Sequence, residues 1–312
     1  MKKREVIRVE DMVKVHANRI ILNKINMVVH EGEYYAVYAA KQAGKSVLLN
    51  CILSLFPMDK GRVFLLGKEM EKEPEYIKRN VGVVLEKPAV FRELTVKENI
   101  SYFADMYLKK KNCASEVERA VSWMRLRECR NLYPDKLDKG KLRRLDIACG
   151  AVHRPELMVM DAPADGLDEE SRKIIFEGLN ELHAEGTTLL VASSDEKYIG
   201  GQAEKIALFD HGRIIEEGTV QSLKAMISLK EILVVRGVSI NREQERELQT
   251  LLGLGVVEHR NTELVIRNKK GKNQIKGLMD FFRKKDIVYE QISIRNPTLA
   301  DVFFEITGHR MV

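Results

Sequence analysis

Apolar and polar positions alternate along the first part of the chain. The alternation is clear in Ile7–Glu10 and Ile25–Val29, and it extends over residues 6–38. A period of two residues is typical of strands that bury one face. The pattern therefore predicts a group of antiparallel strands here, with further β-branched runs at 62–66 and 81–85.

Farther along, the apolar spacing changes to that of amphipathic helices over residues 94–131. Thr95 is a suitable N-cap for the first helix, and Cys113–Arg130 has the pattern of a second. Short apolar runs then alternate with helical patterns, at Leu157–Asp161, Thr188–Ala192 and Lys205–Phe209. This alternation predicts an α/β fold with a parallel sheet.

The pattern restarts near 224–230, which predicts a second domain. The expected strands are Ile232–Arg236, Val256–His259, Leu264–Arg267 and Ile287–Ile294, and the expected helices are Arg242–Leu252, Asn273–Arg283 and a short one from Pro297. A βαββαβ order is typical of a small ferredoxin-like α+β domain. We therefore expect one domain at 1–228 and an accessory domain at 229–312.

The stretch Ala39–Ser46 reads Ala-Ala-Lys-Gln-Ala-Gly-Lys-Ser, between a predicted strand at 33–38 and an apolar helix at 47–53. A P-loop in this setting holds nucleotide phosphates with backbone N–H groups and a lysine, and its hydroxyl binds Mg²⁺. Lys45 and Ser46 have the side chains for these roles. Ala39 replaces the first glycine of the motif and adds a Cβ where none is expected, so the loop is imperfect. A chance Gly-Lys-Ser in a surface turn is the alternative.

Composition limits the function further. With 45% hydrophobic and 31% charged residues among 312, the chain has ordinary globular composition. The net charge of +6 suits a nucleotide or a membrane surface, but the charge is spread along the chain, and we expect no nucleic-acid partner. The cysteines show no metal-ligand spacing: Cys51, Cys113, Cys129 and Cys149. No apolar run approaches the roughly 18 residues of a membrane span, so any membrane role requires another subunit.

Three further motifs follow the loop along the chain. Asp161 ends an apolar strand, where its carboxylate can bind Mg²⁺ beside the P-loop hydroxyl. Residues 137–141 form a turn that opens a helix, and Asp165–Asp168 follows the strand. In the order and spacing of these motifs, residues 1 to about 225 resemble the nucleotide-binding subunit of ABC transporters. The tail Asn296–Gly308 resembles the C-terminal end of the drug- and bacteriocin-export type.

The resemblance implies a P-loop NTPase core of the ABC type, with an antiparallel strand group and a helical subdomain at about 87–150. In this family two subunits sandwich two ATP molecules, each between the P-loop of one subunit and the signature turn of the other. Closure of the dimer then drives a transmembrane permease subunit. The implied location is the cytoplasmic face of the cell membrane, through that permease.

The resemblance also assigns site residues. His16 falls at the position of the adenine-stacking aromatic, and Glu86 at that of the glutamine that couples the site to the permease. The expected residues for ATP are His16, Lys41, Gln42, Ala43, Gly44, Lys45, Ser46, Val47, Glu86 and Asp161. The expected Mg²⁺ ligands are Ser46, Glu86 and Asp161.

Three positions depart from the family. Ala162 replaces the glutamate that polarises the attacking water, and a methyl group accepts no proton. Asp195 replaces a histidine after the next strand. The signature Leu-Ser-Gly-Gly-Gln becomes Leu137–Lys141, that is Leu-Asp-Lys-Gly-Lys, so Asp138, Lys139, Gly140 and Lys141 form the signature turn.

Asp138 has two interpretations. It replaces a serine that hydrogen-bonds the γ-phosphate across the dimer, where an ionised carboxylate at ~4 Å would cost on the order of 4 kcal/mol at an effective dielectric of about 20. Lys139 or Lys141 would offset part of this. Alternatively, Asp138 simply caps its helix.

General-base catalysis contributes about 10²–10⁴-fold to turnover. We therefore expect a degenerate subunit that binds Mg-ATP, hydrolyses it weakly or not at all, and pairs with a second, more active ATP-binding subunit. A regulatory subunit that binds no nucleotide, with Ala39 and Gln42 blocking the loop, is one alternative. An active ATPase that uses Asp195 or Glu86 as its base is another.

Overall fold

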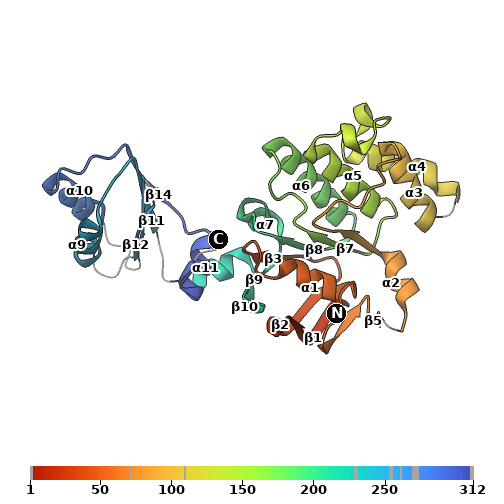
Figure 1. Ribbon diagram of the computed structural model, residues 1–312, viewed down its shortest axis with the longest axis horizontal. Coiled ribbons are helices and arrows are strands. Elements are labelled where there is room, and N and C mark those ends of the chain that lie inside the picture. The colour runs from red at the N-terminus through yellow and green to blue at the C-terminus, as the bar shows by residue number, and fades with distance from the viewer. Residues whose placement is uncertain are drawn as a thin grey trace. The chain divides into compact units, whose positions relative to one another are not determined.

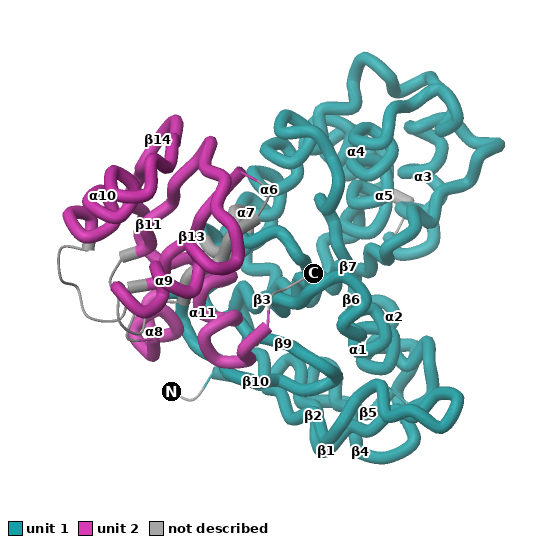
Figure 2. Tube along the Cα trace, turned by 60° about the vertical axis from the view of Figure 1, so that its left-hand side comes forward, with its two compact units in different colours: residues 1–220, 311–312 teal, residues 221–310 magenta. Residues whose placement is uncertain are grey.

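The computed structural model describes residues 3–70, 72–108, 110–227, 231–252, 256–260, 262–268 and 274–309. The chain forms two compact units, residues 1–220 and 221–310 (Figure 2). The predicted domain boundary at 228–229 lies outside the described residues.

A six-stranded sheet carries the core of the first unit (Figure 1). Its order is β10–β9–β3–β8–β7–β6, and only the edge pair β10–β9 is antiparallel. The strands are β3 (Tyr34–Ala39), β6 (Val81–Val84), β7 (Leu157–Asp161), β8 (Thr188–Ser193), β9 (Lys205–Asp210) and β10 (Arg213–Gly218). Every residue of β3, β7 and β8 is buried, as expected where both faces of a parallel sheet are covered. The predicted parallel sheet is confirmed.

A separate antiparallel sheet has the order β2–β1–β4–β5. Its strands are β1 (Glu5–His16), β2 (Arg19–His30), β4 (Lys60–Leu65) and β5 (Lys68–Glu69). One buried cluster joins this sheet to the parallel sheet across helix α1 (Lys45–Ile52), with Leu22 from β2, Leu48 from α1 and Phe209 from β9. The predicted antiparallel strand group is confirmed, and its packing fixes α1 beside the ends of the parallel strands.

Three helices form the helical part of this unit: α3 (Val96–Tyr107), α4 (Lys110–Trp123) and α5 (Lys139–Ala151). Thr95 caps α3 in a capping box with Glu98, as predicted. The predicted helix at Cys113–Arg130 is wrong at its end. Arg125 has φ 51°, which stops α4, and a 3₁₀ turn at Arg127–Cys129 follows. The apolar pattern ran on because Leu126 and Cys129 are buried in the same core.

The first unit also contains α2 (Pro74–Asn80), α6 (Glu169–Ala184) and α7 (Glu196–Gln202). Helix α8 (Val220–Met226) begins at the boundary between the two units. Helix α6 begins at an Asp168 cap, whose carboxylate accepts the Ser171 N–H at 2.8 Å. The loop 162–168 therefore lies between β7 and α6, at the carboxyl end of β7.

The second unit is a four-stranded antiparallel sheet with the order β12–β13–β11–β14. Its elements are β11 (Glu231–Arg236), α9 (Arg242–Leu252), β12 (Val256–Arg260), β13 (Glu263–Asn268), α10 (Gln274–Lys284), β14 (Gln291–Arg295) and α11 (Leu299–Thr307). This is the predicted ferredoxin-like βαββαβ arrangement. The last strand starts later than predicted because Asp286 has φ 50° and the Ile287 N–H still bonds to the Phe282 carbonyl.

In the described part of the chain, no helix is long and apolar enough to cross a membrane.

Candidate nucleotide-binding site

The loop between β3 and α1 makes a sharp turn. Gln42 and Gly44 have left-handed backbone angles, with φ 64° and 102°. Gly44 is the N-cap of α1, and no side chain caps the helix. The first N–H groups of α1 are therefore directed to the loop's concave side without a side-chain acceptor, which is the arrangement that binds phosphate.

Ala39 does not disturb this turn. It is the last residue of β3, it pairs in register with Phe209 of β9, and it is fully buried in the core. It has no positive φ, so its Cβ adds no backbone strain. The expected backbone strain at Ala39 is therefore absent, because this position lies in the strand and its methyl group packs inward. The effect of the Ala39 Cβ on the approach of phosphates stays a prediction.

A cavity of about 490 Å³ lies beside the loop. It is lined by Lys41, Gln42, Lys45, Ser46, Glu86, Asp161 and Ala162, all predicted site positions, and by Arg143, Asp165 and Gly166. The structure thus brings together the P-loop, the segment after β6 and the end of β7. Sequence reasoning did not assign Arg143 or Asp165 to the site.

Four other predicted nucleotide contacts lie off the cavity lining. His16 is exposed at the end of β1, where the chain turns into β2. Gly44 lies in the turn itself, and Ala43 and Val47 are half-buried and pack against the core. These four residues therefore do not line the cavity, whose lining is mostly charged and polar.

Asp161 is the most buried acid of the site, with 2% of its surface exposed. Its Oδ1 has no hydrogen-bond partner among the described residues. Burial raises the pKa of Asp161, the Ser46 hydroxyl and Lys45 lower it, and Glu86 raises it again. An unpaired buried carboxylate oxygen beside a hydroxyl and a second carboxylate is a donor set that fits Mg²⁺.

Ala162 follows Asp161 directly and has φ 49°. Its N–H donates to the Ala192 carbonyl at 2.8 Å, which ties the end of β7 to β8. Its side chain lines the cavity, so a methyl group lies where the resemblance leads us to expect a glutamate.

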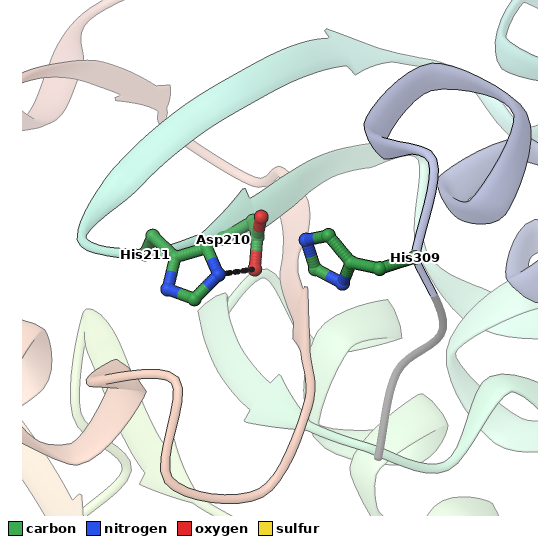
Figure 3. Close-up of side chains that lie close together, drawn as sticks. All are labelled: Asp210, His211 and His309. Carbon is green, nitrogen blue, oxygen red and sulfur yellow. Dashed lines mark ion pairs between the residues drawn. The ribbon is translucent and has the colours of Figure 1, made fainter.

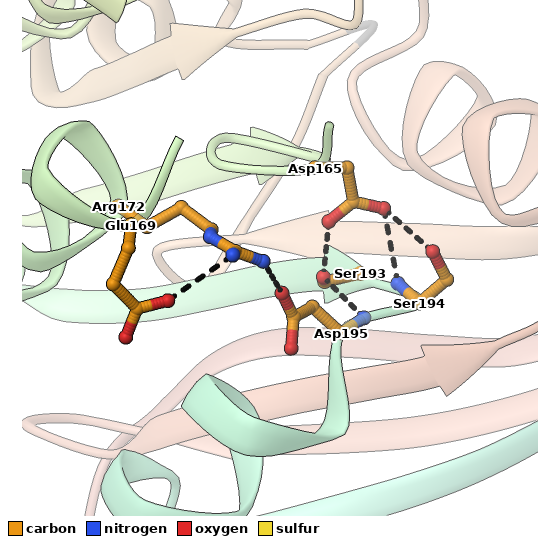
Figure 4. Close-up of polar contacts among 6 residues, drawn as sticks. All are labelled: Asp165, Glu169, Arg172, Ser193, Ser194 and Asp195. Atoms are coloured by element: carbon orange, nitrogen blue, oxygen red, sulfur yellow. Dashed lines mark hydrogen bonds and ion pairs between the residues drawn. The ribbon is translucent and has the colours of Figure 1, made fainter. Parts of the chain in front are cut away.

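Asp195 belongs to a polar network that also contains Arg172, Ser193 and Asp165 (Figure 4). Its carboxylate lies 2.9 Å from the Arg172 guanidinium, and its N–H donates to the Ser193 hydroxyl at 3.0 Å. Asp165 accepts hydrogen bonds from the hydroxyls of Ser193 and Ser194. Asp195 lines a smaller cavity of about 280 Å³ that shares Lys41 and Asp165 with the first.

The signature turn opens helix α5. Asp138 accepts the Lys141 N–H at 2.7 Å and forms a 2.7 Å ion pair with the Lys141 ammonium. Lys141 lowers the pKa of Asp138, and Asp138 in turn raises the pKa of Lys141. Asp138 is therefore an ionised N-cap, while Lys139 is exposed.

Gly140 is required by packing between α5 and α6. A Cβ at this position would lie 1.9 Å from the Ser171 hydroxyl oxygen and 2.7 Å from the Ser171 Cβ. Only a glycine permits this approach, which brings the signature turn against the first turn of α6.

Asp210 and His211, at the turn after β9, form a polar contact outside the nucleotide cavity (Figure 3). The His211 Nε2 atom lies 3.9 Å from the Asp210 carboxylate, and the His211 side chain is 83% exposed. Asp210 is buried, but the exposed His211 ring and the long 3.9 Å separation leave this contact little effect on stability.

Comparison with known proteins identifies the family of the chain. Residues 22–165 match the family model described as ABC transporter. The linearmycin resistance ATP-binding protein LnrL of Bacillus subtilis (strain 168) is 24% identical over 309 residues, which covers 98% of this chain and 99% of that protein. The arginine transport ATP-binding protein ArtM of the same organism is 30% identical over 219 residues, which covers 68% of this chain and 91% of that protein.

The fold of the first unit also matches a solved structure, a dimeric ATP-binding cassette in a post-hydrolysis state with ADP and Pi. The TM-score is 0.63 at 20% identity, and the match covers 68% of this chain and 98% of that one. The cavity formed by the loop, Glu86 and Asp161 lies within this shared fold. With the loop, the cavity and these relatives together, the chain belongs to the ATP-binding proteins of ABC transporters.

Proposed function

We propose that this chain is an ABC exporter subunit that holds Mg-ATP at its own P-loop and hydrolyses it weakly or not at all. It works beside a second, more active ATP-binding subunit. The observation that carries the proposal is Ala162, whose methyl group lines the cavity directly after Asp161. No proton acceptor stands at the position where the family has its base.

The parts that bind nucleotide are retained. Lys45 and the uncapped start of α1 face the phosphates, and the cations Lys41 and Arg143 line the same cavity. Ser46, Glu86 and Asp161 supply oxygen ligands for Mg²⁺, which balances phosphate charge when it is bound.

The parts that would use the nucleotide are weakened. Asp195 is ion-paired with Arg172, so its carboxylate is a poor candidate for a replacement base. Loss of a general base removes about 10²–10⁴-fold of rate. A homodimer would repeat this loss at both sites, which favours a partner subunit with its own base.

The signature turn supports the same asymmetric arrangement. The Asp138 carboxylate is used within α5, where it caps the helix and pairs with Lys141. A partner's nucleotide facing this turn meets a carboxylate with its charge offset locally, in place of the serine hydroxyl of the family. We infer slow turnover at that site as well.

The full-length match to a drug-resistance ATP-binding protein supports an export role. In this role the chain docks on a transmembrane permease subunit at the cytoplasmic face of the cell membrane. The second unit, 221–310, is included in that full-length match.

Calorimetry with Mg-ATP on the full chain, beside a turnover assay, tests the proposal. Wild type should bind, and turnover should stay at the background given by Lys45→Ala, which also loses binding. Absence of binding at millimolar nucleotide would favour a nucleotide-independent regulatory subunit. Steady turnover that disappears in Asp195→Ala would instead indicate an ATPase with a different base.

A further inference from the structure

Arg143 connects helix α5 to the nucleotide cavity. Its NH1 group donates to the Leu85 carbonyl at 2.6 Å, and its NH2 group donates to the Glu86 carbonyl. The side chain is 10% exposed and lines the cavity. The Arg143 side chain, which comes from α5, therefore holds the backbone of Glu86.

Asp146 makes a second attachment, one turn farther along α5. One carboxylate oxygen accepts the Ala89 N–H at 2.9 Å, and the other lies 3.1 Å from Arg143 NH1. The Asp146 side chain is 4% exposed. A buried pair of this kind depends on both partners, because removal of one leaves an unpaired buried charge. Helix α5 thus fixes the segment 85–89 at both ends.

The segment matters because Glu86 and Asp161 line the same cavity. Two acids in one cavity repel each other unless a cation lies between them. A small displacement of the Glu86 backbone would separate the two oxygen ligands and leave Mg²⁺ with Asp161 and Ser46 alone.

We propose that Arg143 is a positioning residue of the metal site, which holds the Glu86 backbone so that the Glu86 carboxylate would serve with Asp161 and Ser46 as a ligand of Mg²⁺. This inference rests on the proposed binding of Mg-nucleotide. Three of the five N–H groups of Arg143 bond to Leu85, Glu86 and Asp146, so most of its hydrogen-bonding capacity is used within the protein.

Calorimetry on the full chain, with ATP in Mg²⁺ and with ATP in EDTA, tests this role. Arg143→Gln should reduce the affinity gained from Mg²⁺ by about 10–100-fold, which is the usual cost of losing a partner that orients a metal ligand. The affinity for ATP in EDTA should stay within about threefold, because the phosphate contacts of Lys45 are unchanged.

Arg144→Gln is the matched control. Arg144 is equally buried, and it donates to the carbonyls of Met124 and Arg125, which lie away from residues 85–89. This variant should keep the Mg²⁺-dependent gain. The double variant Arg143→Gln with Glu86→Ala should lose no more Mg²⁺-dependent affinity than Glu86→Ala alone, since both changes act on the same Mg²⁺ ligand.

The outcomes separate the two proposals. If wild type binds no Mg-ATP, the proposed function fails and the role of Arg143 fails with it. If wild type binds and Arg143→Gln keeps the full Mg²⁺ gain, only the role of Arg143 is wrong. An equal loss in EDTA, or a loss of the Mg²⁺ gain in Arg144→Gln, also overturns it. If Arg143→Gln does not fold, Arg143→Lys replaces it. Lysine lacks the planar fork of donors that reaches Leu85, Glu86 and Asp146 together, so the same loss is expected.

Discussion

The Asp195 carboxylate and the Arg172 guanidinium form an ion pair of 2.9 Å beside the nucleotide cavity. The resemblance places Asp195 where the family has a histidine, so we expect its negative charge near the proposed phosphate site. Arg172 also contacts Glu169 at 3.1 Å, and its charge offsets that of Asp195. We therefore propose that the pair allows a carboxylate beside a phosphate site.

Arg172→Ala should therefore weaken Mg-ATP binding, by up to about fivefold, because partly exposed pairs contribute about 0.2–1 kcal/mol. The double variant Arg172→Ala with Asp195→Ala should recover most of the affinity, which calorimetry can measure. If the double variant binds no better than Arg172→Ala alone, the pair does not screen the phosphate site.

Gly140→Ala should destabilise the protein by about 1–3 kcal/mol, the usual cost of overpacking. The new Cβ would overlap the Ser171 side chain, which is within 1.9 Å of it. Denaturant unfolding measures the loss, and Ser171→Ala in the same chain should relieve part of it. Gly201→Ala is the control: it lies in α7 with open space around its Cβ, and its stability should not fall.

Asp138→Ala should cost about 0.5–2 kcal/mol through loss of the α5 cap. Asp138→Ser keeps an oxygen acceptor for the Lys141 N–H, so it should retain most of the stability. Because Lys141 lowers the pKa of Asp138, this contribution is present above the ordinary value of 3.8 and is lost as the pH falls below it. Equal stability of the Ala and Ser variants at neutral pH would show that the cap is unimportant.

The pH dependence of stability should also report on Asp146. Burial raises its pKa to about 6 from an ordinary 3.8, so the folded protein binds this proton more tightly than the unfolded chain. The stability contributed by the proton is complete below about pH 4 and is lost as the pH rises through 6. Asp146→Asn removes this titration, so its unfolding free energy relative to wild type should shift in its favour by about 3 kcal/mol between pH 4 and 7. A cost that does not depend on pH, from leaving Arg143 without its carboxylate partner, should lower the stability of the variant at every pH.

His153 acts in the opposite direction over the same range. Burial lowers its pKa to about 4 from 6.5, so stability falls as the pH drops from about 6.5 to 4. Its ring stacks on Tyr107 at 4.2 Å. His153→Phe keeps an aromatic ring and should flatten this limb in urea unfolding at several pH values. A variant with the wild-type slope would show that His153 is not the group responsible.

Much of the fold was predictable because the spacing of apolar residues indicates each strand or helix, and loop and cap residues mark where each element begins or ends. The strand, loop and helix at 33–53, the Thr95 cap and the βαββαβ order of the second unit follow from local chemistry. Ala39 shows the limit: its motif position suggested a strained turn, whereas packing places it in a buried strand end. Arg143 and Asp165 were missed because their partners lie 57 residues away at Glu86 and 28 residues away at Ser193. No local pattern encodes such contacts.

The contact between Gly140 and Ser171 has a mechanical consequence. With no room for a Cβ between them, the turn at 138–141 packs directly against the first turn of α6. We expect this contact to resist sliding of α5 along α6, so that a rotation of α5 would move the loop 165–168 with it. Such coupling would depend on steric fit and would not require hydrolysis in this subunit.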